Sequence, residues 1–210
     1  MSEIQSGENA ASESKRSPLK WAIVAVMVVG VAAVLYVIAA ASFKPSGPAN
    51  LTEFKRATLA KLDVPATPRP APTQTFFDAA GKPLTVADFK GQVVVMNLWA
   101  TWCAPCKKEM PTLARLQAAY ATQPVTVLAI SVDRDSDLNL AQAEMAANAP
   151  LKLYRDPGYK LSFALEPRAA GYPTTIIYDR QGLERARLAG DADWASPEAR
   201  GLIEKLLAER

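Results

Sequence analysis

The chain has no histidine, and it has only two cysteines among its 210 residues. The absence of histidine excludes His-ligated zinc, copper and haem sites, and it also excludes a histidine general base. Two cysteines alone make a weak metal site, so we predict neither a bound metal nor a cofactor. The net charge of +3 is small, and the basic residues form no block interleaved with aromatics. Nucleic acid is therefore a poor candidate for a partner.

Charged residues are also missing from one long segment near the N-terminus, residues 21–41. This segment is mostly Val, Ala, Ile and Leu, and as a helix it would span about 31 Å, enough to cross the hydrocarbon core of a bilayer. We therefore predict a single transmembrane helix at residues 19–41. The small residues at 39–41 leave a cleaved signal peptide as the alternative. Basic residues flank both ends, so they favour a cytoplasmic N-terminus only slightly.

The predicted anchor separates a polar tail from the rest of the chain. Residues 1–18 are rich in Ser, Glu, Ala and Gly, which is typical of a disordered tail. Residues 42–74 are predicted to be a linker with a short amphipathic helix at 51–62 and a proline-rich, extended spacer at 64–73. We expect the helix to dock on the main domain, with the membrane surface as the alternative.

Residues 75–210 are predicted to form one α/β domain. Near-continuous apolar runs at 93–99 and 125–132 indicate strands of a sheet that is covered on both faces. Further elements are expected as hairpins at 75–84 and 174–188, a short strand at 151–154, one helical turn at 85–89, and helices at 103–120, 137–148, 159–165 and 196–209. This order implies a parallel centre with antiparallel edges.

Both cysteines, Cys103 and Cys106, lie where a predicted strand passes into a predicted helix. Random placement gives this spacing on the order of one time in a hundred. The free N–H groups and the dipole at a helix start stabilise a thiolate. A purely structural disulfide would gain little from closing so short a loop, and a zinc half-site would need a second Cys or His pair. We therefore predict a redox-active dithiol with Cys103 as nucleophile and Cys106 as resolving cysteine.

The residues around this dithiol resemble the thioredoxin superfamily, specifically the membrane-anchored TlpA/ResA/CcmG group of bacterial thiol–disulfide proteins. The resemblance covers residues 75–210. It rests on Trp102-Cys103-Ala104-Pro105-Cys106 with its flanks at 97–101 and 107–111, on Gly171-Tyr172-Pro173-Thr174-Thr175, and on residues 189–198. The second, structural cysteine pair that TlpA proteins can carry is absent. The resemblance implies a thioredoxin-like fold with a central mixed sheet, helices on both faces and an extra central helix at 137–148.

The resemblance also assigns roles to residues around the cysteines. Glu109 tunes the buried thiol and relays its proton, although the residues alone indicate an ordinary solvated glutamate. Pro173 is a cis-proline that faces the dithiol, although the residues alone favour an ordinary turn proline. The backbone of Tyr172 pairs with an extended substrate, and Trp102 forms part of the substrate rim. The lysines at 107 and 108 are interpreted as a solvated rim, Asn97 as a hydrogen-bonded core residue, and Trp99 and Trp194 as core packing.

These features predict a membrane-anchored reductant of client disulfides. Ala104 and Pro105 put no charge or extra donor beside the nucleophile, unlike the donors that over-stabilise the thiolate of strong oxidants. By resemblance the domain lies in the periplasm, with residues 1–18 in the cytoplasm, the protein spans the bacterial inner membrane once, and a transmembrane thiol donor regenerates it.

By the same resemblance, the clients serve respiratory cytochrome assembly. They are a copper-site protein of cytochrome oxidase or its copper chaperone, which residues 172–175 and the Trp194 region favour, or apocytochrome c with its haem-attachment cysteines. A general dithiol oxidase and a Cu(I) carrier remain as alternatives. A thiol peroxidase would need an isolated low-pKa cysteine with an arginine, a layout that the nearby Cys106 argues against.

Overall fold

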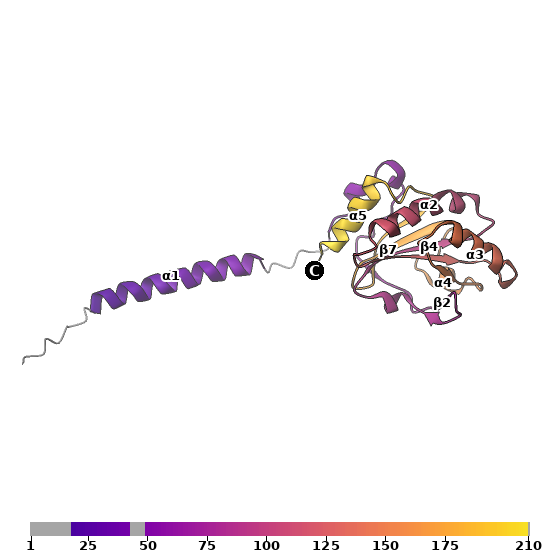
Figure 1. Cartoon of the computed structure of the whole chain (residues 1–210). Coiled ribbons are helices and arrows are strands. Elements are labelled where there is room, and N and C mark those ends of the chain that lie inside the picture. Colours follow the sequence, from indigo (N-terminus) through magenta and orange to yellow (C-terminus); the bar gives the residue numbers. More distant parts are fainter. Residues whose placement is uncertain (1–17, 43–48, 210) are drawn as a thin grey trace, which may run out of the picture. The chain divides into compact units, whose positions relative to one another are not determined.

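The computed structural model describes residues 18–42 and 49–209, and the chain divides into two compact units, Met1–Gly47 and Pro48–Arg210. In the first unit, helix α1 (Pro18–Ser42) exposes the large apolar side chains that the structure describes (Figure 1). Among the described residues, no helix reaches both the length and the hydrophobicity that a membrane crossing demands. The predictions for residues 1–17 and 43–48 fall outside this described part.

The second unit is built on one sheet with the strand order β1-β8-β7-β4-β5-β6-β2-β3. The strands are β1 (Arg69–Pro70), β2 (Phe76–Asp78), β3 (Pro83–Leu84), β4 (Val93–Trp99), β5 (Val125–Ser131), β6 (Leu153–Arg155), β7 (Thr174–Tyr178) and β8 (Leu183–Ala189). Strands β4, β5 and β6 run parallel, whereas all the other pairs are antiparallel. The predicted parallel centre with antiparallel edges is confirmed.

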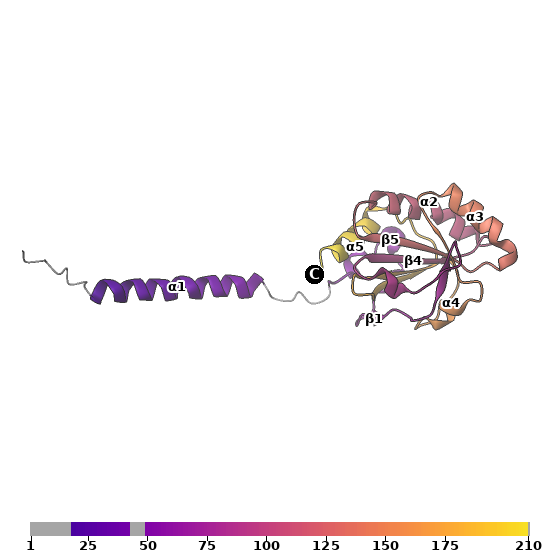
Figure 2. The ribbon, with the colours of Figure 1, turned by 60° about the horizontal axis from the view of Figure 1, so that its bottom comes forward.

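Helices and 3-10 turns cover both faces of this sheet, which gives it two cores. The helices are α2 (Ala104–Ala119), α3 (Leu138–Ala147), α4 (Lys160–Ala164) and α5 (Pro197–Leu207), and the turns are η1 (Thr52–Phe54), η2 (Ala57–Leu59), η3 (Val86–Phe89) and η4 (Asp135–Asp137). Helices α2, α3 and α5 pack on one face and α4 with η3 on the other (Figures 1 and 2). The predicted thioredoxin-like α/β fold is thus confirmed, including the extra helix α3.

The start of this unit differs from the prediction of a linker at 42–74. Residues 51–62 form the turns η1 and η2 instead of one α-helix, because the backbone is extended at Arg56 and left-handed at Ala57. Their apolar residues nevertheless dock on the domain, as expected: Leu51, Leu59 and Leu62 are fully buried.

The proline-rich stretch at 64–73 is not a free spacer. Its strand β1 pairs with β8, where Arg69 lies opposite Glu184. Proline lacks a backbone donor, but an edge strand leaves one side unpaired and so tolerates it. Just before this stretch, Asp63 forms an isolated antiparallel bridge with Arg187. The described residues from Ala49 onward thus pack with the compact unit that carries the sheet, upstream of the predicted domain at 75–210.

A buried ionic cluster, which we call the Arg185 cluster, joins the start of the unit to its last residues. Arg185 in β8 lies 3.2 Å from the carboxylate of Asp179 and pairs with Glu209. Glu209 also accepts the backbone N–H of Ala49 at 2.8 Å, and Arg185 donates to the Ala49 carbonyl at 3.3 Å. Because Val94 lies opposite Tyr178 in the sheet, this cluster lies at the end where β4 begins.

Candidate active site

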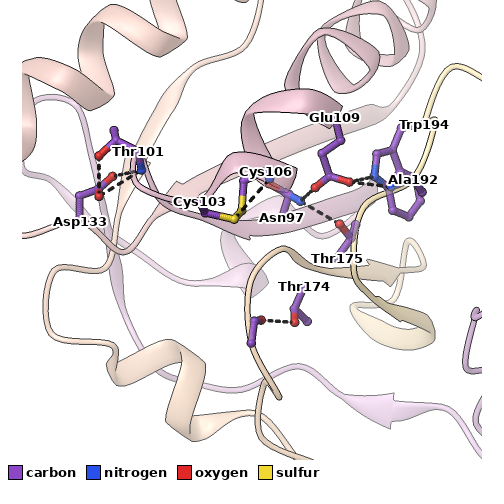
Figure 3. Close-up of a disulfide and its surroundings, with 11 residues drawn as sticks. Asn97, Thr101, Cys103, Cys106, Glu109, Asp133, Thr174, Thr175, Ala192 and Trp194 are labelled. Atoms are coloured by element: carbon purple, nitrogen blue, oxygen red, sulfur yellow. Dashed lines mark hydrogen bonds between the residues drawn. A yellow bond between two sulfur atoms is a disulfide. The ribbon is translucent and has the colours of Figure 1, made fainter.

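The two cysteines form a disulfide at the N-terminus of α2, with their Sγ atoms 2.02 Å apart (Figure 3). Strand β4 ends at Trp99, a short loop follows, and Cys103 caps the helix: its sulfur accepts the backbone N–H of Cys106 at 3.3 Å. Proline at the second helical position suits a helix start, because the N–H it lacks would have no helical partner there. Cys103 is 5% exposed and Cys106 is 0% exposed. This order fits the predicted roles of nucleophile and resolving cysteine, which stay predictions.

The loop before the dithiol is held by a buried carboxylate that the sequence reading did not single out. Asp133 accepts the backbone N–H of Thr101 at 3.0 Å and the Thr101 hydroxyl at 2.9 Å. It also accepts the Ser131 hydroxyl at 2.8 Å. Strands β4 and β5 are parallel neighbours, so their carboxyl ends meet at one edge of the sheet. An acidic residue directly after an apolar strand is the sequence signal that points to this position.

Glu109 lies on α2, three residues after Cys106, and it is 1% exposed rather than solvated. Its Oε1 accepts the side-chain N–H of Asn97 at 2.7 Å. Its Oε2 accepts the backbone N–H of Ala192 and the indole N–H of Trp194, both at 3.0 Å. Burial raises the pKa of Glu109 to about 7. The three donors favour the carboxylate and lower the pKa, but the effect of burial is larger. The group can therefore take up or release a proton near neutral pH.

Asn97 connects this carboxylate to the sheet (Figure 3). Its Nδ2 donates to Glu109 and also to the Thr175 hydroxyl of β7 at 2.8 Å. Its Oδ1 is buried and has no partner among the described residues. The prediction of a hydrogen-bonded core residue is confirmed. The contribution of Thr175, which comes from a strand far along the chain, was missed.

The predicted substrate rim gathers at the same edge of the sheet. Thr174 lies opposite Leu98, so Pro173 is placed near the end of β4, and its peptide bond with Tyr172 is cis, as the resemblance implies. The ring of Tyr172 meets Trp102 edge-on at a centroid distance of 5.9 Å. Within the described part of the chain, the backbone N–H and C=O of Tyr172 make no hydrogen bond. They are free to pair with an extended peptide, which leaves substrate binding a prediction.

The two lysines that follow the dithiol each pair with a carboxylate. Lys107 lies 3.6 Å from Glu144 of α3, and Lys108 lies 2.8 Å from Asp191 in the loop after β8. Both lysines are largely exposed, in agreement with a solvated rim. No group of three or more His, Cys, Asp or Glu side chains in the described ranges is placed to hold a metal ion.

The sequence of this chain is similar to those of known thiol-disulfide proteins. Residues 67–186 match the AhpC/TSA family. A thiol-disulfide oxidoreductase ResA of Bacillus cereus is 26% identical over 138 residues, which cover 65% of this chain and 76% of that protein. The thioredoxin-like protein YneN of Bacillus subtilis is 31% identical over 122 residues, 54% of this chain and 65% of that protein.

The fold is also similar to solved structures of thiol:disulfide interchange proteins and their homologues. A putative thiol:disulfide interchange protein DsbE from Chlorobium tepidum gives a TM-score of 0.59 at 24% identity, over 70% of this chain and 99% of that chain. A DsbF homologue from Corynebacterium diphtheriae gives a TM-score of 0.57 at 27% identity, over 69% of this chain and 90% of that chain. With the Cys103–Cys106 pair at the head of α2, these similarities make the protein a thiol:disulfide oxidoreductase. The chain belongs to the AhpC/TSA family, and its thioredoxin-like domain is similar to ResA and DsbE proteins, as the resemblance to the TlpA/ResA/CcmG group implies.

Proposed function

We propose that this protein is a membrane-anchored reductant of client disulfides on the periplasmic side of the bacterial inner membrane. The observation that carries the dithiol chemistry of this proposal is the buried Glu109, whose pKa is raised to about 7 by burial and which lies one helical turn from Cys106. A resolving thiol must lose its proton before it attacks, and a chain without histidine needs another base near neutral pH. Glu109 follows Cys106 by one turn of α2 and has the proton affinity for that work.

The proposed reaction moves two electrons from the dithiol to the client. The Cys103 thiolate attacks one sulfur of the client disulfide, which forms a mixed disulfide and releases the other client sulfur as a thiolate that takes a proton from water. Cys106 then gives its proton to the Glu109 carboxylate, and its thiolate attacks the Cys103 sulfur. The Cys103–Cys106 disulfide forms, and the second client cysteine leaves as a thiolate that is protonated. Glu109 later returns its proton to solvent.

The rim supports an extended client segment. The unpaired backbone groups of Tyr172 can add a short strand of client chain beside the dithiol, and this needs no particular client sequence. Trp102, which is 63% exposed, offers a large apolar contact next to Cys103.

The proposal of anchoring by α1 rests on its sequence and on the exposure of its described apolar side chains. Residues 21–41 carry no charge, and the described apolar side chains are exposed, which is unfavourable in water. The orientation, with the thioredoxin-like domain in the periplasm, rests on the resemblance.

The client class also rests on the resemblance. We propose a copper-site protein of cytochrome oxidase, or its copper chaperone, whose cysteines must be reduced before they bind metal. The alternative client is apocytochrome c, whose haem-attachment cysteines must likewise be thiols. A transmembrane thiol donor would restore the reduced form of Cys103 and Cys106 after each turnover.

The test is to trap the client. In Cys106→Ser the mixed disulfide through Cys103 cannot be resolved, so we expect a disulfide-linked partner to accumulate in cells and to be identified by mass spectrometry. Cys103→Ser, which removes the nucleophile and leaves Cys106 buried, is the matched control and should trap nothing. Alkylation of the wild-type protein in cells should find mainly the dithiol. Absence of a trapped partner, or a mainly disulfide form in cells, would contradict the proposal.

A further inference from the structure

We infer that Trp194 is a positioning residue that sets the proton affinity of Glu109, so that the loop at 190–195 is a working part of the site. Sequence reasoning assigned Trp194 to core packing. The inference rests on the proposed role of Glu109 as a proton carrier, and it concerns how that role is adjusted.

The contacts hold Trp194 firmly against the carboxylate. Trp194 is 1% exposed, and its indole N–H donates to Oε2 of Glu109 at 3.0 Å. Its backbone N–H donates to the Thr112 hydroxyl at 3.0 Å, one turn further along α2. The backbone N–H of Ala192 reaches the same Oε2 at 3.0 Å. Backbone hydrogen bonds from Ala192 to Glu109 and from Trp194 to Thr112 thus fix the loop to α2.

The chemistry of the indole gives this contact a direction. An indole N–H can donate a hydrogen bond but cannot accept one, so it stabilises the carboxylate more than the protonated acid. Two donors meet at Oε2, which leaves Oε1 as the oxygen that takes the proton. Oε1 faces the amide of Asn97, whose Oδ1 has no partner within the described residues. If this amide turns over, Oδ1 can accept the new O–H, because the two ends of an amide differ only in donor and acceptor character.

The remaining groups that face Glu109 leave Trp194 as the most direct side chain to change. The charge of Asp191 opposes ionisation of Glu109 from the same loop, and Asp191 is itself paired with Lys108 at 2.8 Å. Cys106 precedes Glu109 on α2, and Asn97 and Thr175 are neutral. Replacement of Trp194 by phenylalanine removes one donor, keeps an aromatic ring and changes no charge.

The experiment compares Trp194→Phe with Trp99→Phe in the oxidised full-length chain in detergent. In this form neither cysteine titrates. The infrared band of a protonated carboxylic acid is followed against pH, and the band that Glu109→Gln removes is assigned to Glu109. Loss of one hydrogen bond to a charged group should raise the proton affinity of Glu109 about tenfold in Trp194→Phe. Trp99 is the matched control: it is 0% exposed and its indole N–H has no partner in the described part of the chain, so Trp99→Phe should leave the titration unchanged.

A titration of Trp194→Phe that stays within about twofold of wild type would overturn the inference. If that variant fails to fold, the inference can be tested in the wild-type protein. The indole N–H signal of Trp194 is then followed against pH by nuclear magnetic resonance. This signal must move with the Glu109 titration and must stop moving in Glu109→Gln; a signal that ignores pH overturns the inference. None of these measurements requires a client. If Trp194→Phe raises the proton affinity of Glu109 as expected but Cys106→Ser traps no client, the proposed function is contradicted and the inference about Trp194 stands.

Discussion

The raised pKa of Glu109 has a consequence for folding that Glu109→Gln makes measurable. Glutamine has the shape of glutamate, and its carbonyl oxygen can accept the donors of Ala192 and Trp194 in place of Oε2. Its NH2 group then faces Asn97, whose unpartnered Oδ1 can accept it once that amide turns over. The variant therefore keeps the hydrogen bonds and removes only the titration.

The magnitude follows from the pKa of Glu109, which rises from 4.5 in the unfolded reference to about 7 in the folded protein. The folded state therefore binds the proton more tightly than the unfolded state. Between these two pKa values the unfolded chain has lost the proton while the folded chain still holds it. The free energy of unfolding consequently falls as pH rises through this window, by about 3 kcal/mol in total, and levels off above it. Glu109→Gln lacks this decline.

The assay is urea unfolding of the disulfide form of the Pro48–Arg210 unit, which has its own core, from below pH 4.5 to about pH 8. The quantity of interest is the wild-type free energy of unfolding minus that of Glu109→Gln. We expect it to fall with pH by about 3 kcal/mol, with half of the change reached near the middle of the window. Trp99→Phe changes no titratable group, so its offset from wild type should not vary with pH. If the difference in the free energy of unfolding between wild type and Glu109→Gln does not vary with pH, the argument that burial raises the pKa of Glu109 is refuted.

Three further substitutions test other parts of the structure. Asp133→Ala leaves the donors of Thr101 and Ser131 without an acceptor and should lower the free energy of unfolding by about 2–4 kcal/mol. Asp133→Asn keeps one carbonyl oxygen and should lose less in the same urea assay; equal losses would contradict this account. Trp102→Ala should change stability by less than about 0.5 kcal/mol because Trp102 is 63% exposed, yet it should slow mixed-disulfide formation by Cys106→Ser with a disulfide peptide. Phe163→Ala, also at a site 63% exposed, is its control, and equal rates in the two variants would remove Trp102 from the rim. Glu209→Gln weakens the Arg185 cluster and should speed hydrogen exchange at residues 49–62 but not in α2; uniform exchange would show that this cluster does not hold the segment.

The sequence alone predicts the centre of this fold well because the signals there are local. Strand β4 has the bounds 93–99 that its apolar run indicates, and α2 starts at the cysteines, where strand and helix patterns meet. The segment at 51–62 shows the limit of such signals. Its apolar residues have helical spacing, and they do pack on the domain, but the backbone turns at Ala57 and breaks the helix into two short pieces.

The environment of Glu109 is a property of tertiary structure and leaves no local signal. Its spacing from Cys106 places it on the same side of α2, but whether that side meets water depends on a loop about eighty residues later in the chain. Trp194 itself reads as a large apolar residue, and only the folded structure shows where its N–H points. The resemblance to a known group supplied the prediction for Glu109, while the partners that adjust it became visible with the fold.

The Arg185 cluster determines where a force on Ala49 would enter the sheet. A pull on Ala49 is transmitted to Glu209 and Arg185, and from there to α5 and the outer strand β8. The cysteines follow the far end of β4, whose seven residues extend for about 23 Å. A load applied at Ala49 therefore enters through β8 and α5, at the opposite end of the sheet from the dithiol. The loop at 190–195, which joins β8 to α5 and contacts Glu109, is the part of the site that would receive such a load first.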